Sequence, residues 1–209
     1  MKTEIIGMMP PERPVFPSHV QWTGSNRFLS PPECEMIRAH ADALALQAGT
    51  IGNADAKSAK EVASYRCVET CALTGPKFDW LYERIIEKIK LANNELFRFS
   101  LVGLGEAVGY LKYTAPTAEQ PVAGHYNWHQ DFGGGPYSLR KLSMVIQLSD
   151  PSEYEGCRLQ LCNDGPWECG YIQQGDAIMF PSWTPHQVTE ITRGERRALV
   201  VWVTGPQFT

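Results

Sequence analysis

The sequence predicts a mainly β protein with N-terminal helices, folded as a double-stranded β-helix (jelly roll). Residues 30–49 and 76–97 carry apolar side chains at three- and four-residue intervals, as amphipathic helices do. After residue 98, short runs rich in Val, Ile, Leu and aromatic residues alternate with Gly, Pro, Asn and Asp. Helices first and many short strands afterwards favour a jelly-roll core backed by the helices. We expect one domain, made of an N-terminal arm (1–29), a helical support region (30–98) and a double-stranded β-helix core (99–209).

The first helix is expected to begin at Ser30. Ser30 can cap the helix and Glu33 stands three residues later, as in a capping box. Gly49 is expected to end it. The predicted apolar stripe is Met36, Ile37, Ala41 and Leu44. Residues 50–66 are polar and are expected to form a loop.

The second helix is expected over residues 76–97. Its predicted packing face is Phe78, Leu81, Ile85, Ile89, Ala92 and Leu96. The strands are expected within residues 106–113, 125–131, 141–150, 157–162, 177–180, 186–191 and 197–204. The 141–150 run alternates apolar and polar residues, which is typical of a half-buried strand.

Composition restricts the partners. Hydrophobic residues make up 43% of the 209 residues, enough for a sizeable core. The net charge of −4 and the lack of a Lys/Arg run argue against nucleic acid as a partner. No apolar run approaches the roughly 20 residues that span a bilayer, and the N-terminus does not resemble an export signal, so we expect a cytoplasmic protein without a membrane partner. Six reduced and mostly buried thiols are therefore expected: Cys34, Cys67, Cys71, Cys157, Cys162 and Cys169.

The stretch GHYNWHQDFGGG, residues 124–135, suggests a metal site. Residues two apart on a regular strand point to the same face, so His129 and Asp131 can converge on one ion. His125 and Asn127 would share that face if the strand is regular.

A third ligand must come from elsewhere in the chain. His40 lies inside the first predicted helix and His19 lies in the proline-rich arm, whereas His186 opens a late strand that a jelly roll can bring beside residues 125–131. Two histidines and one carboxylate, with open positions, form the facial triad of non-haem Fe(II) oxygenases.

Arg196 stands ten residues after His186, at the start of an apolar strand. A guanidinium in that position would be partly buried and would need an anionic partner. Because Arg binds carboxylates through two parallel hydrogen bonds, a dicarboxylate cosubstrate would suit it.

With these motifs in place, the sequence resembles the prolyl-4-hydroxylase-like branch of the 2-oxoglutarate/Fe(II)-dependent dioxygenases. The matching segments are HYNWHQD, RKLSMVIQLSD, GDAIMFPSWTPHQVTEITRGERRALVVWV and the closing GP, together covering about residues 100–206. The resemblance implies iron on His129, Asp131 and His186. It also implies that Arg196 binds the distal carboxylate of 2-oxoglutarate and that Tyr113 hydrogen-bonds this cosubstrate.

The same resemblance implies a hydroxylase that consumes O₂ and releases succinate and CO₂, with ascorbate as an accessory reductant. The substrate class does not carry over, because CRLQL and TAPTAEQPVAG depart from the usual pattern. Peptidyl, amino-acid and small-molecule substrates all stay open. A cupin-like metal-binding protein, or a metalloenzyme that uses the same three ligands without 2-oxoglutarate, is the alternative.

Several assignments stay open. Arg197 could replace Arg196, and Tyr110 could replace Tyr113. His125 could contact substrate or be a hydrogen-bonded core residue. Gly133–Gly135 could form a substrate lid or a wide turn. The oligomeric state is not predicted.

Overall fold

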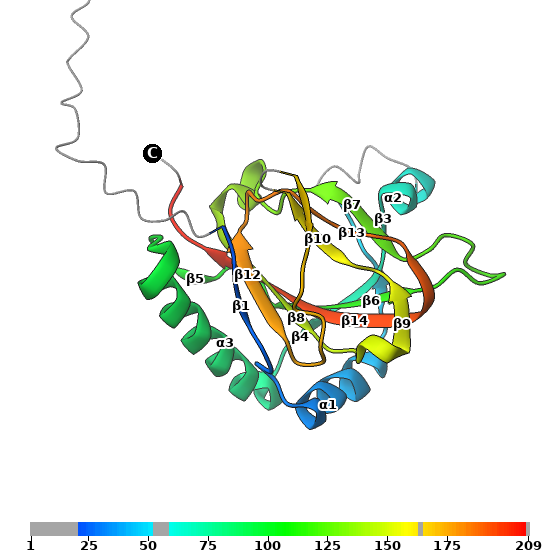
Figure 1. Ribbon diagram of the computed structural model, residues 1–209. Helices are drawn as coiled ribbons and strands as arrows, with labels where there is room; N and C mark the ends of the chain where they lie inside the picture. Colours follow the sequence, from blue (N-terminus) through cyan, green and yellow to red (C-terminus); the bar gives the residue numbers. More distant parts are fainter. Residues whose placement is uncertain (1–20, 52–58, 163–164, 208–209) are drawn as a thin grey trace, which may run out of the picture.

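Two antiparallel β-sheets face each other, and two helices cover the outer face of the larger sheet (Figure 1). The computed structural model describes residues 21–51, 59–162 and 165–207. Among these residues the larger sheet has nine strands. Seven of them run in the order β1 (Thr23–Ser25), β12 (Ala177–Pro181), β8 (Arg140–Gln147), β14 (Ile191–Thr204), β6 (Val108–Thr114), β4 (Glu69–Leu73) and β2 (Gln47–Ala48). The other two, β5 (Gly103–Leu104) and β9 (Tyr154–Gly156), pair with β14.

The smaller sheet carries the strands in which the site histidines were expected. Its five described strands run in the order β11 (Pro166–Glu168), β10 (Leu159–Cys162), β13 (His186–Val188), β7 (His125–His129) and β3 (Arg66–Cys67). All seven predicted strand segments contain a strand of one of the two sheets. The prediction of a mainly β fold with N-terminal helices is confirmed.

The first helix, α1 (Pro31–Asp42), begins as predicted and ends early. The Ser30–Glu33 capping box is present. The predicted end at Gly49 is wrong, because residues 47–48 form β2 and the Gly49 N–H donates to the Val68 carbonyl at 2.7 Å. Pairing with β4 thus replaces the last helical turns. The predicted stripe is wrong at two residues: Met36 is 53% exposed and Leu44, beyond the helix, is 38% exposed.

The second helix is confirmed over its whole predicted length. A 3₁₀ turn (Pro76–Phe78) leads into α3 (Asp79–Ala92), which continues as a π-helical turn (Asn93–Phe97). Five of the six predicted packing residues are buried, and Leu96 is partly buried against the same core. The Asn93 side chain ends the helix by bonding both the N–H and the carbonyl of Phe99.

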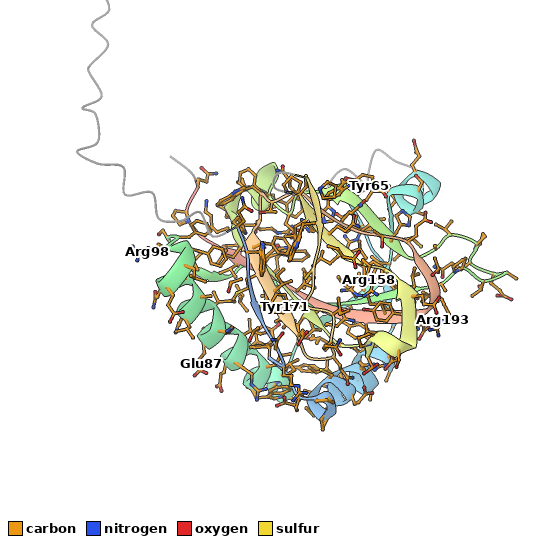
Figure 2. The ribbon with its side chains drawn as sticks, in the orientation of Figure 1. Tyr65, Glu87, Arg98, Arg158, Tyr171 and Arg193 are labelled. Carbon is orange, nitrogen blue, oxygen red and sulfur yellow. The ribbon has the colours of Figure 1, made fainter. Side chains whose placement is uncertain are left out.

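The loop expected over residues 50–66 is wrong over residues 59–66, whereas residues 50 and 51 are irregular as expected. Residues 59–65 form a helix, α2 (Ala59–Tyr65), while residues 52–58 lie outside the described part. Tyr65, labelled in Figure 2, donates its hydroxyl proton to the Trp128 carbonyl at 2.6 Å, which joins α2 to β7. The polar sequence of this segment gave no sign of that tertiary contact.

Two hydrophobic cores lie on the two sides of the larger sheet. One lies between that sheet and helices α1 and α3, and the other lies between the two sheets. β14 contributes to both, since Leu199 and Val201 pack toward the helices while Val200 and Trp202 pack toward the smaller sheet. Residues 193–196 belong to this strand, and Gly194 (φ 73°) permits its bend.

The six cysteines are all free, as expected. Three are buried and three are half-buried. No helix in the described residues is both long enough and apolar enough to span a membrane.

Candidate metal centre

Three side chains predicted as ligands meet between the two sheets. His129 ends β7, His186 begins β13, and these residues are direct partners across the antiparallel pair. Asp131 follows two residues after β7. Its carboxylate oxygens lie 3.8 Å from His129 Nε2 and 3.6 Å from His186 Nε2. One ligand atom from each residue falls within 4.8 Å of the other two.

A β-bulge in β7 determines which of its side chains point toward this centre. His186 pairs with His129 and Val188 with Tyr126, so β7 has one extra residue between the two pairs. Tyr126 therefore lies on the same side as His129, and its ring stacks on that imidazole with centroids 3.4 Å apart.

The expectation that His125 and Asn127 share the metal face applied only to a regular strand, and β7 is not regular. The bulge breaks the two-residue alternation on which it depended. His125 is buried, with Nδ1 2.8 Å from the Ala123 carbonyl and Nε2 3.2 Å from the Ser64 carbonyl. Asn127 donates to the same Ser64 carbonyl. His125 is therefore a hydrogen-bonded core residue.

Both ligand imidazoles are oriented by carbonyl groups of the backbone. His129 Nδ1 lies 2.7 Å from the Asn127 carbonyl, and His186 Nδ1 lies 2.9 Å from the Thr184 carbonyl. A carbonyl only accepts, so each Nδ1 carries the proton and each Nε2 offers a lone pair toward Asp131.

The Asp131 carboxylate is fixed by a hydroxyl pair. Ser143 donates to Asp131 Oδ2 at 2.6 Å, and the Ser143 and Ser182 hydroxyls lie 3.0 Å apart. Ser143 was not among the predicted site residues; its only signal in the sequence is that it is a small polar residue within a predicted strand.

The pKa values of His129 and Asp131 are shifted toward the protonation states that bind metals. Burial, followed by the nearby His186, lowers the pKa of His129 to about 3, which keeps that imidazole neutral. Burial raises the pKa of Asp131, but the two imidazoles and the Ser143 hydroxyl outweigh it, so the net pKa is lowered and the carboxylate is charged. Neutral imidazole and ionised carboxylate are the ligand forms for a divalent cation.

The structure separates the two arginine candidates. Arg196 is 5% exposed, faces the metal pocket and donates from Nε to Gln147 Oε1 at 3.0 Å. Among the described residues, no carboxylate lies within 4.0 Å of its side-chain nitrogens. Arg197 points to the helix side of the sheet, where it pairs with Asp42 and Glu195.

The two tyrosine candidates separate in the same way. Tyr113 is opposite Arg196 in the β6–β14 pair, lines the pocket and lies with its ring centroid 5.6 Å from that guanidinium. Tyr110 faces the helices and donates its hydroxyl proton to Asp42 at 2.6 Å. The roles predicted for Arg196 and Tyr113 are thus compatible with their positions.

The pocket around the centre is mostly apolar. Its apolar wall includes Leu111, Val145, Leu159, Val188, Val200 and Trp202. Tyr126 and Arg66 also line it and were not among the predicted site residues. Tyr126 depends on the bulge and Arg66 on the pairing of β3 with β7, and neither feature has a local sequence signature.

The donor set fits a ferrous ion. Two neutral imidazole nitrogens and one carboxylate, on one side of a lined pocket, form the facial arrangement of non-haem Fe(II) sites and leave other coordination positions free. The dry wall and the buried guanidinium are suited to an organic anion beside the metal.

Part of this chain is similar to a known family. Residues 111–204 match the sequence model of the 2OG-Fe(II) oxygenase superfamily. A PKHD-type hydroxylase of Nitrosomonas europaea is 37% identical over 86 residues, which cover 38% of this chain and 37% of that protein. A PKHD-type hydroxylase of Parvibaculum lavamentivorans is 29% identical over 119 residues, which cover 57% of this chain and 51% of that protein. The chain thus spans about a third to a half of these relatives.

Solved structures show the same fold. A Pseudomonas putida prolyl-4-hydroxylase superposes with a TM-score of 0.65 at 19% identity, covering 90% of this chain and 94% of that one. A Trichoplax adhaerens prolyl hydroxylase, solved with a hypoxia inducible factor peptide fragment, gives a TM-score of 0.69 at 16% identity, covering 88% and 83%. The predicted double-stranded β-helix is confirmed. The match over residues 111–204 confirms the predicted resemblance to the 2-oxoglutarate/Fe(II)-dependent dioxygenases.

Proposed function

We propose that this chain, a member of the 2OG-Fe(II) oxygenase superfamily, is a 2-oxoglutarate- and Fe(II)-dependent hydroxylase. When bound, iron and 2-oxoglutarate supply the oxidation of an unactivated C–H bond by O₂, with release of succinate and CO₂. The observation that carries the proposal is the convergence of His129, Asp131 and His186 in one pocket with a buried guanidinium that lacks a carboxylate partner among the described residues.

Each site residue has a defined task. His129 and His186 present Nε2 to the metal because backbone carbonyls hold their Nδ1 protons. Asp131 supplies the charge, and Ser143 fixes its orientation. Arg196 binds the distal carboxylate of 2-oxoglutarate. Tyr113, beside it, donates to the same carboxylate.

The apolar wall excludes water from the reacting carbon. Six aliphatic or aromatic side chains of the wall come from both sheets, so they surround the space beside the three ligands. Exclusion of water protects a reactive site from side reactions. The relatives include PKHD-type hydroxylases and a prolyl hydroxylase solved with a peptide, so a peptidyl or small-molecule substrate suits this chain.

The cupin-like alternative uses the same ligands without 2-oxoglutarate. It leaves the buried charge of Arg196 without a function, and burying an uncompensated charge is costly. Arg196 therefore favours the 2-oxoglutarate-dependent reaction.

Succinate formation tests the proposal. Purified protein supplied with Fe(II), 2-oxoglutarate, O₂ and ascorbate is expected to form succinate slowly even without substrate. His186→Ala and Asp131→Ala are expected to abolish it because each removes a ligand. His40→Ala is the matched control, since His40 lies on α1 and contacts Lys77 and Phe78 on the helix side of the larger sheet. Normal succinate formation by either ligand variant would refute the assignment.

A further inference from the structure

Arg66 brings a second guanidinium into the metal pocket. It belongs to β3 of the smaller sheet, whereas Arg196 belongs to β14 of the larger one. Both side chains line the cavity that contains the three ligands. The two positive charges therefore enter one pocket from facing sheets.

The position of Arg66 is fixed by its neighbours. Nη1 donates to the Thr50 carbonyl at 2.5 Å, and Cζ lies 4.6 Å from the centroid of the Tyr126 ring, which itself stacks on His129. Gly49 leaves the space that the guanidinium occupies, since a Cβ there would lie 2.9 Å from Arg66 Nε. The side chain is thus held one aromatic ring away from a metal ligand.

Arg66 lacks an anionic partner in the described part of the chain. Its Nε is buried without a hydrogen-bond acceptor. No carboxylate of a described residue lies within 4.0 Å of it, whereas Arg38, Arg140 and Arg197 each pair with one or more carboxylates. A partly buried guanidinium in a pocket wall with unused donors is a ready carboxylate receptor.

The charges in the loaded pocket lead to the same conclusion. A ferrous ion carries two positive charges and 2-oxoglutarate carries two negative charges. Asp131 and Arg196 then cancel each other, while both ligand histidines donate from Nδ1 as neutral imidazoles. The charge of Arg66 is left over, so an anionic group of the substrate would neutralise the pocket.

We propose that Arg66 binds a carboxylate of the substrate, which makes the substrate of this hydroxylase a carboxylic acid. The inference rests on the proposed function, because the pocket is taken as the place of reaction. The carboxylate belongs either to a small acid or to an acidic side chain of a peptide. In both cases it would lie on the side of the pocket where Arg66 stacks on Tyr126.

Matched pairs of charged and neutral probes test the proposal by binding rather than turnover. Protein loaded with Zn(II) and saturating 2-oxoglutarate is titrated calorimetrically with benzoate or benzamide. A second arm uses the blocked tripeptides acetyl-Ala-Asp-Ala-amide and acetyl-Ala-Asn-Ala-amide. In at least one arm the charged member is expected to bind about tenfold tighter or more. The arm that shows the preference identifies the source of the carboxylate.

Arg66→Gln is expected to remove this preference while the Kd for 2-oxoglutarate stays within about twofold. Arg193→Gln, which makes the same charge change at an exposed ion pair with Glu155, is expected to retain it (Figure 2). Arg66→Lys keeps the charge and is expected to keep the preference, with weaker binding. This variant carries the test if Arg66→Gln does not fold.

Equal binding of charged and neutral probes in both arms would overturn the inference. So would an unchanged preference in Arg66→Gln, an unchanged Kd for the charged probe in Arg66→Lys, a loss of preference in Arg193→Gln, or displacement of 2-oxoglutarate by benzoate. Failure of 2-oxoglutarate itself to bind would instead refute the proposed function. In that case the same titrations are repeated without 2-oxoglutarate. Loss of charged-probe binding in Arg66→Gln would still support the inference about Arg66, whereas loss in Arg196→Gln alone would contradict it.

Discussion

Arg196 and Arg197 are neighbours on β14, yet their guanidiniums lie on opposite faces of the nine-stranded sheet. The first lines the metal pocket and donates to Gln147, and the second pairs with Asp42 beneath the helices. A strand alternates its side chains between faces, so adjacent residues can serve a binding site and a structural core.

We therefore expect the same substitution to impair binding at one arginine and stability at the other. Arg196→Gln is expected to weaken 2-oxoglutarate binding by about 30-fold or more, because it removes the charge that pairs with the distal carboxylate. Its protein should remain folded, since no ion pair within the described residues is lost. Calorimetric titration of the Zn(II)-loaded protein measures the affinity.

Arg197→Gln is expected to leave that affinity unchanged and to lower the free energy of unfolding by about 1–3 kcal/mol. The loss comes mainly from Asp42, which keeps its charge without its ion-pair partner, while Glu195 still pairs with Lys112. Urea denaturation gives the free energy. Weaker 2-oxoglutarate binding in a folded Arg197→Gln protein would mean that the two arginines have been assigned the wrong way round.

Ser143→Ala is expected to weaken metal binding by about 10- to 100-fold. The substitution removes the hydroxyl that donates to Asp131 Oδ2 but leaves all three ligands. Competition with a chromophoric chelator for Co(II) measures the affinity. Ser152→Ala, at an exposed turn, is the control, and equal Co(II) affinities for the two variants would show that Ser143 does not orient the carboxylate.

Arg140 is expected to support the same ligand through the backbone. Its Nη1 donates to the Asp131 carbonyl at 3.1 Å, both carboxylate oxygens of Glu106 accept from it, and its Cζ lies 3.8 Å from the Trp202 ring centroid. Arg140→Met should lower the free energy of unfolding by about 1–3 kcal/mol, mainly because it leaves the buried Asp131 carbonyl without a donor. The lost pair with Glu106 contributes less, since that side chain is 40% exposed. Thermal and urea denaturation measure this, and the Co(II) affinity should fall as well.

Glu106→Gln is the milder partner of that substitution. The amide oxygen still accepts from Arg140, so the loss of unfolding free energy should be less than half as large. Equal losses for both variants would mean that the contact with Asp131 contributes nothing.

The metal ligands could be predicted from the sequence because their chemistry is local. His129 and Asp131 lie two residues apart, and His186 was the one remaining histidine in a strand context. The long α3 helix was also predictable, since its apolar period covers several turns. Local patterns of this kind fix the type of an element and some of its contacts.

The unpredicted features depend on residues far apart in the chain. The bulge that turns Tyr126 toward the metal appears only when β7 is aligned with β13. Arg66 reaches the pocket because β3 pairs with β7, some 60 residues later. The helix α1 ends at Asp42 because β2 finds a partner in β4. Each of these features depends on how a strand pairs with a segment far away in the chain. A short stretch of sequence carries no information about that pairing.

Alkylation tests the burial of the thiols. Burial raises the pKa of Cys34 to about 12 and those of Cys157 and Cys169 to about 11, so at pH 8 these groups carry almost no reactive thiolate. Iodoacetamide should therefore add at most three groups to the native protein and six in urea, as read by intact mass. Peptide mapping should find Cys34, Cys157 or Cys169 modified only after unfolding; rapid native labelling of any of them would contradict this packing.

The placement of β14 has a consequence for biosynthesis. This strand comes last in the sequence, but it lies between β8 and β6 in the sheet and also pairs with β5 and β9. While the ribosome is still adding residues before 191, β6 and β8 both expose an unpaired edge, and such edges invite association with other chains. Closure of the barrel and delivery of Arg196 to the pocket therefore happen together, and a chaperone that shields β-edges during translation should raise the yield of active protein.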